Sequence, residues 1–233
     1  MNILGINAYH GDSSACILKD GIVIAATEEE RFKRIKHWAG FPTEAIKFCL
    51  EEAKIPVEEL DFVTISRNPK ANLSKKEIHT LRNKVGFKTI CDRLINSKKV
   101  SSLKEELAKV FSVSPSEIKA KFHNIEHHRS HIASSFFASK FENSAILSID
   151  GFGDFTSTMT AMGKGNKFKV LDSVIYPHSL GIFYTGVTQF LGFPNYGDEY
   201  KVMGLAPYGE AKYLEELSQI LELTKDGFFT LNK

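Results

Sequence analysis

The chain has 233 residues, of which 42% are hydrophobic and 25% are charged, as in ordinary soluble globular proteins with a buried core. Its formal net charge of +2 gives no reason to expect a nucleic-acid or membrane partner. The sequence does not start like a leader peptide, and no uncharged apolar run reaches the ~18 residues of a membrane span. Cys16, Cys49 and Cys91 are widely spaced and form no CxxC motif, which favours reduced thiols in a cytoplasmic protein.

The amino-terminal part predicts an α/β unit that opens with strands. Strands are expected at four apolar runs, which are residues 2–8, 14–18, 22–27 and 60–66. The turn Lys19-Asp20-Gly21 joins the second and third runs as a hairpin. Residues 45–53 carry apolar side chains at helical spacing, behind a helix start at 41–44. This order predicts half of an RNase H-like, actin-like fold, in which a mixed sheet is flanked by helices.

Residues 68–114 differ from their surroundings because they are rich in Lys, Asn and Ser. They contain no strong strand pattern, and two helices are expected at about 78–94 and 103–110. The segment is therefore interpreted as a helical insertion rather than a separate domain. Its excess of Lys and Arg is interpreted as a solvated face, because aromatic residues do not alternate with the charges as base stacking would require.

Strands and helices alternate again after residue 121. Strands are expected at residues 122–125, 144–150, 156–162 and 168–173. Helices are expected at residues 127–139, 179–191 and 211–223. Residues 228–231 begin a further element.

The most informative motif is His127-His128-Arg129-Ser130-His131, followed nineteen residues later by Asp150. On a helix, His127 and His131 lie four positions apart on one face, and a carboxylate at the end of the next strand adds a third ligand. Two imidazoles and a carboxylate suit Fe2+, Zn2+ or Mn2+. The motif lacks the Glu of a zinc protease. The alternative is a polar helix start with surface histidines.

Three further segments are suited to ligands. Asp150-Gly151-Phe152-Gly153-Asp154 places an acid and glycines at a strand end, where a backbone can approach metal or phosphate. The loop at 9–14 offers small polar residues for an anion, with His10 as a general base or carbonyl-oxygen ligand. Ser179 is placed to cap a helix whose positive end faces a phosphate. Each also has a simpler interpretation, which is a β-turn, a hairpin turn or an ordinary cap.

Six segments together resemble one protein family. They are YHGDSSACIL, TEEERFKRIKH, HHRSHIASSFF, SIDGFGD, SLGIFY and GDEYKVMGLAPYG. Outside residues 68–114 the chain is similar to the NodU/CmcH-type O-carbamoyltransferases, which modify nodulation factors, cephalosporins and aminoglycosides. The number and order of the motifs make a chance match hard to credit.

The resemblance implies both a fold and a reaction. It implies an amino-terminal actin-like domain related to the one that places threonylcarbamoyl on tRNA adenosine. It also implies a carboxy-terminal YrdC-like domain that makes carbamoyl-adenylate from ATP and carbamoyl phosphate. The carbamoyl group is then passed to a hydroxyl of a small-molecule acceptor, such as a sugar or an antibiotic.

The same resemblance carries roles over to individual residues. His127, His131 and Asp150 match the family's iron ligands, and His10 matches its catalytic histidine. Asp150 and Gly181 match positions near the adenine nucleotide. Lys36 and His37 fall in a motif near the active-site cleft and receive no role.

Members of this family are much longer than 233 residues. The chain is therefore expected to be the first part, 1–233, of such a transfer domain, without the second half-domain, a fourth metal ligand and the YrdC-like domain. We expect it to be inactive alone. We also expect it to self-associate, as a homodimer, through the surface left where the second lobe should lie.

Two other functions stay open at this point. One is a threonylcarbamoyl transferase acting on tRNA, which the near-neutral charge and the first and last of the six motifs disfavour. The other is a non-catalytic nucleotide- or metal-binding or assembly module, which the short chain favours. The retention of His10, His127, His131 and Asp150 argues against such a module.

Overall fold

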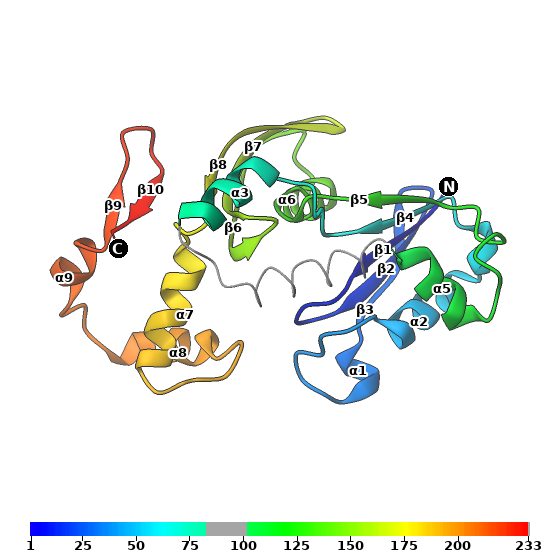
Figure 1. Ribbon diagram of the computed structural model, residues 1–233, viewed down its shortest axis with the longest axis horizontal. Coiled ribbons are helices and arrows are strands. Elements are labelled where there is room, and N and C mark those ends of the chain that lie inside the picture. The colour runs from blue at the N-terminus through cyan, green and yellow to red at the C-terminus, as the bar shows by residue number, and fades with distance from the viewer. Residues whose placement is uncertain (83–101, 233) are drawn as a thin grey trace. The chain divides into compact units, whose positions relative to one another are not determined.

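The computed structural model describes residues 1–82 and 102–232, which form two compact units, Met1–Glu126 and His127–Lys233 (Figure 1). None of the helices in these described ranges combines the length and apolar character that crossing a bilayer requires. Each unit has its own sheet and its own hydrophobic core.

The first unit is built on a five-stranded sheet in the order β3-β2-β1-β4-β5. Its strands are β1 (Asn2–Asn7), β2 (Ser14–Lys19), β3 (Ile22–Glu28), β4 (Phe62–Ile65) and β5 (Lys121–Asn124). The first three strands form an antiparallel meander, whereas β4 and β5 run parallel to β1 on its other side. This is the strand order of the RNase H-like fold, so the predicted mixed α/β class is confirmed.

Two helices of this unit, α2 (Thr43–Ala53) and α5 (Leu103–Phe111), bury side chains against the sheet. The other described elements are α1 (Glu30–Lys33) and α3 (Leu73–Arg82), which have no buried residues, and a 3-10 turn at Val57–Glu59. Alternate strand residues such as Leu4, Ile17 and Val63 are fully buried against Ile46 of α2 and Leu107 of α5. Burial alternates along each strand because successive side chains point to opposite faces of the sheet.

The segment interpreted as a helical insertion contributes to this core. Of its two predicted helices, the second is confirmed as α5, whose Leu103, Leu107 and Ala108 are buried in the same cluster as the sheet. The first begins at Leu73, earlier than predicted, and residues 83–94 of that prediction lie outside the described residues. The parts of 68–114 that the structure describes contain no strand.

The second unit contains an antiparallel meander of β6 (Asn143–Gly153), β7 (Thr156–Lys164) and β8 (Lys167–Ile175). Its core joins Ile132 and Phe136 of α6 (His127–Ala138) to Ile146, Met159 and Ala161 of the sheet. The remaining elements are α7 (Leu180–Phe190), α8 (Glu199–Leu205), a 3-10 turn at Ala206–Tyr208, α9 (Leu214–Ser218), β9 (Leu221–Leu223) and β10 (Phe229–Leu231).

The helix predicted at 211–223 is wrong over most of its length. Only Leu214–Ser218 are helical, and Leu221–Leu223 pair with Phe229–Leu231 as a hairpin. Gly227 adopts φ 84° in the connecting turn, and its N–H donates to the Thr224 carbonyl at 3.0 Å. Leu and Glu favour helices by propensity, and the pairing with a second strand overrides that weak preference here.

Candidate metal centre

Helix α6 presents two of the predicted ligands from its first turns. The Asp154 carboxylate accepts a hydrogen bond from the backbone N–H of His127 at 3.0 Å, which satisfies one of the free donors at the helix start. Ile132 and Phe136 bury one side of the helix on the sheet. His127 and His131, four positions apart, therefore share a side, as the sequence predicts.

An irregularity in β6 positions the third predicted ligand. The pairing with β7 is regular up to Ile149, which lies opposite Thr158, and resumes only at Gly153 opposite Thr156. Asp150 therefore falls in a bulge, where the strand leaves the ladder and a side chain can be aimed anew. Its own carboxylate also accepts from the backbone N–H of Gly151 at 2.6 Å.

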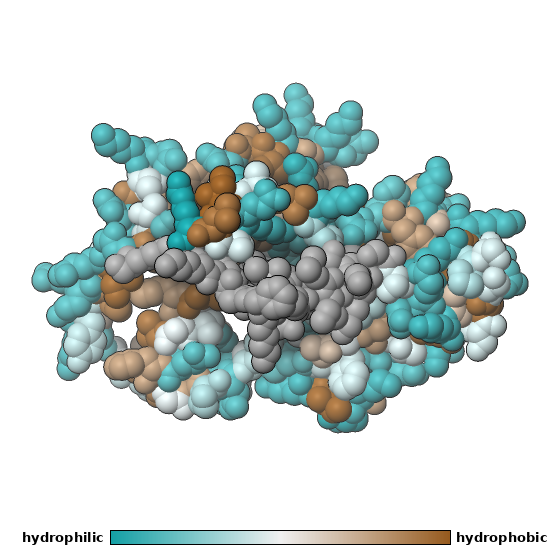
Figure 2. All heavy atoms as spheres, viewed as in Figure 1, coloured by the Kyte–Doolittle hydropathy of each residue, from teal (hydrophilic) through white to brown (hydrophobic). Residues whose placement is uncertain are grey.

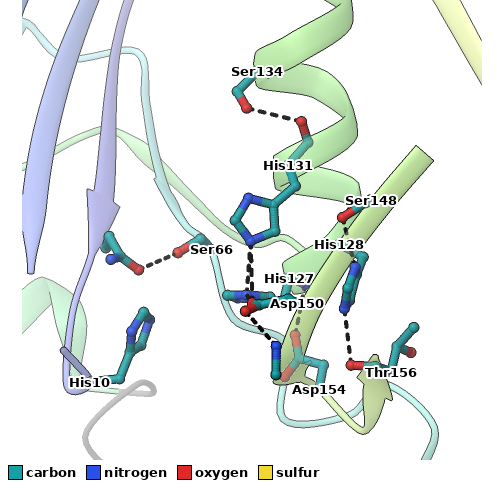
Figure 3. Close-up of polar contacts among 12 residues, drawn as sticks. His10, Ser66, His127, His128, His131, Ser134, Ser148, Asp150, Asp154 and Thr156 are labelled. Atoms are coloured by element: carbon teal, nitrogen blue, oxygen red, sulfur yellow. Dashed lines mark hydrogen bonds and ion pairs between the residues drawn. The ribbon is translucent and has the colours of Figure 1, made fainter. Parts of the chain in front are cut away.

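The three side chains converge on one point (Figure 3). The His127 Nε2 atom lies 2.8 Å from Asp150 Oδ2 and 3.0 Å from His131 Nε2. The His131 Nε2 atom lies 3.6 Å from the same Asp150 oxygen. Two ligands of one divalent ion at ordinary bond lengths are separated by about 3.0–3.4 Å, so these atoms have the spacing of a shared coordination sphere. The donor set fits a metal of the kind predicted.

The site is negatively charged at its centre. Hydrogen bonds to Asp150, the stronger from His127 and the weaker from His131, hold the pKa of its carboxyl well below the usual range. The carboxylate is therefore ionised and available as a metal ligand at neutral pH. His131 is about half exposed and Asp150 is 41% exposed, so the site is open to solvent.

His128 belongs to the same motif as His127 and His131, but its environment is different. It is fully buried, and burial lowers its pKa to about 4, which keeps the ring neutral at pH 7. Its Nε2–H donates to the Thr156 carbonyl at 3.0 Å, and its Nδ1 accepts from the Ser148 hydroxyl at 2.8 Å (Figure 3). His128 thus anchors α6 on the sheet and is not a ligand.

Two glycines permit the close approaches that build the site. A Cβ at Gly153 would lie 2.1 Å from the ring of His127. A Cβ at Gly181 would lie 2.6 Å from the backbone nitrogen of Gly151. The predicted nucleotide residue Gly181 is therefore in the first turn of α7, directly against the Asp150-Gly151 backbone. Neither approach tolerates a side chain without movement of the backbone or the ring.

The start of α7 is capped as predicted. The Ser179 hydroxyl accepts from the Ile182 N–H at 3.1 Å and donates to the Gly151 carbonyl. The positive end of the helix is thereby fixed beside the strand end that carries Asp150.

His10 lies in the first unit, in the loop between β1 and β2. Its Nδ1 is 3.1 Å from the Gly11 carbonyl oxygen. Because a carbonyl oxygen only accepts, Nδ1 carries the proton in that contact and Nε2 is the basic nitrogen. The catalytic role of His10 stays a prediction.

Sequence reasoning missed several residues that shape these sites. Asp154 and Gly153 were predicted only as part of a segment that approaches metal or phosphate, or as a β-turn, whereas Asp154 caps α6 and Gly153 makes room for His127. In the first unit, Asp12, Glu30 and His37 also bring their ligand atoms within 4.8 Å of one another. From the sequence, Asp12 was noted only as part of the 9–14 loop expected to suit an anion, Glu30 only within a family motif, and His37 without a role. No local spacing rule links the three, because they meet only through the fold.

Comparisons with known proteins agree with this architecture. The family model described as carbamoyltransferase N-terminus matches residues 2–233. An uncharacterized protein of Synechocystis is 39% identical over 99% of this chain and 38% of its own length. The nodulation protein NolNO of Sinorhizobium fredii is 34% identical over 97% of this chain and 32% of its own length. The chain thus spans about a third of the length of these curated relatives.

Solved structures are similar only at a distance. YeaZ from Pseudomonas aeruginosa matches with a TM-score of 0.41 and 11% identity, over 76% of this chain and 66% of that one. Component A of the (R)-2-hydroxyglutaryl-CoA dehydratase of Acidaminococcus fermentans matches with a TM-score of 0.41 and 14% identity, over 91% of this chain and 70% of that one.

Proposed function

The chain belongs to the family of carbamoyltransferase amino-terminal domains, and from this premise we propose that it supplies part of a site that transfers a carbamoyl group to a small-molecule hydroxyl. ATP is the nucleotide, and carbamoyl phosphate is the source of the carbamoyl group. The observation that carries the proposal is the convergence of His127, His131 and Asp150.

The metal of this site is proposed to be Fe2+, with Zn2+ and Mn2+ as the alternatives that the same donors accept. His127, His131 and Asp150 would hold it. A divalent ion bound there supplies Lewis-acid polarisation of a phosphate or carbamoyl oxygen. The mixed nitrogen and oxygen donors, the ionised carboxylate and the open exposure of His131 support this assignment.

The nucleotide is proposed to bind beside Asp150 and Gly181. The absence of a Cβ at Gly181 lets the first turn of α7 approach the β6 strand end. The amino-terminal end of a helix attracts phosphate through its unpaired N–H groups and its dipole. The same region therefore offers both a cation site and a phosphate-attracting helix end.

His10 is proposed as the residue that takes the proton from the acceptor hydroxyl. In that step the acceptor oxygen forms a bond to the carbamoyl carbon, and the bond from that carbon to the departing adenylate phosphate oxygen breaks. The basic Nε2 of the tautomer described above suits this role. The acceptor is proposed to be a hydroxyl-bearing small molecule such as a sugar or antibiotic, and no nucleic acid is involved.

Metal content is the first test. Anaerobically purified chain, reconstituted with Fe2+, is expected to hold at least one ion per chain. His127→Ala and His131→Ala should each hold about one ion fewer than the parent, because two ligands do not retain the ion of this site against dialysis. The matched control is His123→Ala, which removes an exposed imidazole outside the site. Equal metal content in all four proteins would overturn the assignment.

Nucleotide binding and transfer are the second test. Calorimetry with ATP should show binding that weakens in Gly181→Ala, whereas Gly186→Ala, whose added Cβ meets open space, should bind as the parent does. With labelled carbamoyl phosphate, ATP and a panel of hydroxyl acceptors, the chain alone is expected to bind without steady transfer. Steady transfer by the chain alone would contradict the proposal that it supplies only part of the site.

A further inference from the structure

The first unit contains a second convergence of metal-ligand side chains, apart from the one described above. Asp12 lies in the β1–β2 loop, Glu30 begins α1, and His37 lies in the loop that follows α1. Their ligand atoms lie within 4.8 Å of one another, and all three residues are partly exposed. Two carboxylates and an imidazole thus face a common point that solvent can reach.

Backbone hydrogen bonds hold the segments that carry these side chains. The Ser13 N–H donates to the Trp38 carbonyl at 3.0 Å, and the Tyr9 N–H donates to the Gly40 carbonyl at 3.0 Å. The Glu29 N–H donates to the Ser13 carbonyl at 2.9 Å. Backbone hydrogen bonds therefore join the three segments that carry Asp12, Glu30 and His37. A metal site needs such support, because its donors must be kept close before the ion arrives.

Two buried residues also hold these segments in place. Ser13 and Glu29, each next in sequence to a proposed ligand, are fully buried. The Ser13 hydroxyl donates to the Gly40 carbonyl at 2.9 Å, and the Glu29 carboxylate accepts from the Ala45 N–H at the start of α2 at 2.8 Å. Asp12 and Glu30 therefore project from anchored positions rather than from loose loop tips.

The central contact has the same geometry as the one in the second unit. Nδ1 of His37 lies 2.8 Å from Asp12 Oδ1, as Nε2 of His127 lies 2.8 Å from Asp150 Oδ2. Two ligands of one ion stand about 3.0–3.4 Å apart, so only a small movement converts this contact into shared coordination. The Glu30 carboxylate already accepts from the His37 N–H at 3.0 Å, which places it beside the imidazole.

The charge around the cluster favours a cation. Two carboxylates contribute negative charge, and a carboxylate has about four acceptor positions, so one hydrogen bond does not exhaust it. The exposed Arg31 side chain lies 3.7 Å from one Glu30 oxygen and 3.4 Å from a Glu28 oxygen, so the Glu30 carboxylate is only partly neutralised. Mixed oxygen and nitrogen donors suit transition metals such as Mn2+ and Zn2+ better than Ca2+.

We propose that Asp12, Glu30 and His37 form a second divalent transition-metal site, in the first unit of the chain. A bound ion would tie the segment after α1 to the β1–β2 loop, which also carries His10. The proposal does not depend on the carbamoyl-transfer function or on metal binding by α6. If no ion binds, these three residues serve only to connect the two loops and α1 through the hydrogen bonds described above.

The test uses Zn2+ as the only metal and the full 233-residue chain in which both histidine ligands of the α6 site are replaced. In the variant His127→Ala/His131→Ala, calorimetry and metal analysis after dialysis are expected to find one Zn2+ per chain. Adding Asp12→Asn, Glu30→Gln or His37→Ala should weaken that binding at least ten-fold. Asn and Gln keep the side-chain volume, and circular dichroism checks the fold of each variant. Adding His123→Ala or Asp20→Asn, both exposed, should leave binding unchanged.

A spectroscopic readout separates specific coordination from loose adsorption. Co2+ added to the same double variant should give visible absorption bands that disappear with His37→Ala and persist with His123→Ala. No Zn2+ binding by the double variant at millimolar concentration would overturn the proposal. So would binding that all three ligand substitutions leave unchanged.

Discussion

The two units bury their apolar side chains to very different extents. In the first unit, twenty of the described hydrophobic residues, from the strands, α2, α5 and adjoining loops, form one buried cluster. The buried cluster of the second unit has five members among the described residues. From the last residue of α7 onward, the exposed fraction of large apolar side chains is high, reaching 89% for Phe190 and for Tyr208. Figure 2 shows hydrophobic surface over α7 and α8.

Coverage of the sheets explains the difference. Along β6, Ile146 and Ser148 are buried under α6, whereas Leu147 is 63% exposed and Ile149 points the same way. A sheet buries a face only where another layer covers it. In the first unit both α2 and α5 contribute residues to the buried cluster, whereas in the second unit α6 is the one described helix that does so, and part of β6 stays exposed. Four experiments sharpen or break this contrast.

The largest effect is expected from a cavity in the first core. Ile17→Ala should lower the free energy of unfolding by about 2–5 kcal/mol, because the side chain is fully buried. Amide hydrogen exchange should accelerate across β1–β5 and stay unchanged across β6–β8. Ile22→Ala, at a 67% exposed position of β3, is the control and should change stability by less than about 0.5 kcal/mol. Acceleration spread evenly over both units would show that they unfold together.

A smaller effect, confined to the second unit, is expected at Gly153. Gly153→Ala forces a Cβ to within 2.1 Å of the His127 ring, so the imidazole must move away from Asp150. Iron affinity should fall by about ten-fold or more, while circular dichroism stays unchanged. Gly186→Ala adds a Cβ in open space and should keep the parent affinity. Equal affinities for the two variants would contradict the described geometry.

The exposed apolar side chains predict self-association of the chain. Light scattering should show a molar mass that rises with concentration towards that of a dimer. Phe190→Ser and Tyr208→Ser should reduce this rise, because each removes a large exposed ring. Phe141→Ser removes a ring that is 70% exposed but lies before β6, and should have less effect. A monodisperse monomer at high concentration would refute the expectation.

The smallest effect concerns a thiol in the first core. Burial raises the pKa of Cys49 from 9.0 to about 11, so the thiol stays protonated in the folded chain at pH 8. Alkylation of Cys49, followed by peptide mapping, should be at least ten-fold slower in the folded chain than in urea. The thiol of Cys49 loses its proton at a lower pH in the unfolded chain than in the folded chain. The free energy of unfolding is therefore unaffected by this thiol below pH 9, and it decreases as the pH rises from 9 towards 11. Equal alkylation rates would show that the core opens readily.

Local patterns in the sequence predicted most of the strands and several of the helices, and they predicted that His127, His131 and Asp150 lie close together. Apolar runs in the sequence located β1, β2 and β4, whose alternate residues are buried. The four-residue spacing of His127 and His131, with an acid at the next strand end, indicated a shared site because helix and strand periods are local properties.

Tertiary structure decided what local patterns do not encode. Residues 221–223 became a strand because a second strand was available to pair with them, against their helical propensity. Gly153 and Gly181 are required by side chains and backbone that lie 26 and 30 positions away in sequence, at His127 and Gly151. Asp12, Glu30 and His37 meet only because backbone hydrogen bonds join their segments. Contacts between distant segments depend on the whole packing arrangement, whereas helix and strand periodicity is set by the backbone geometry of each element.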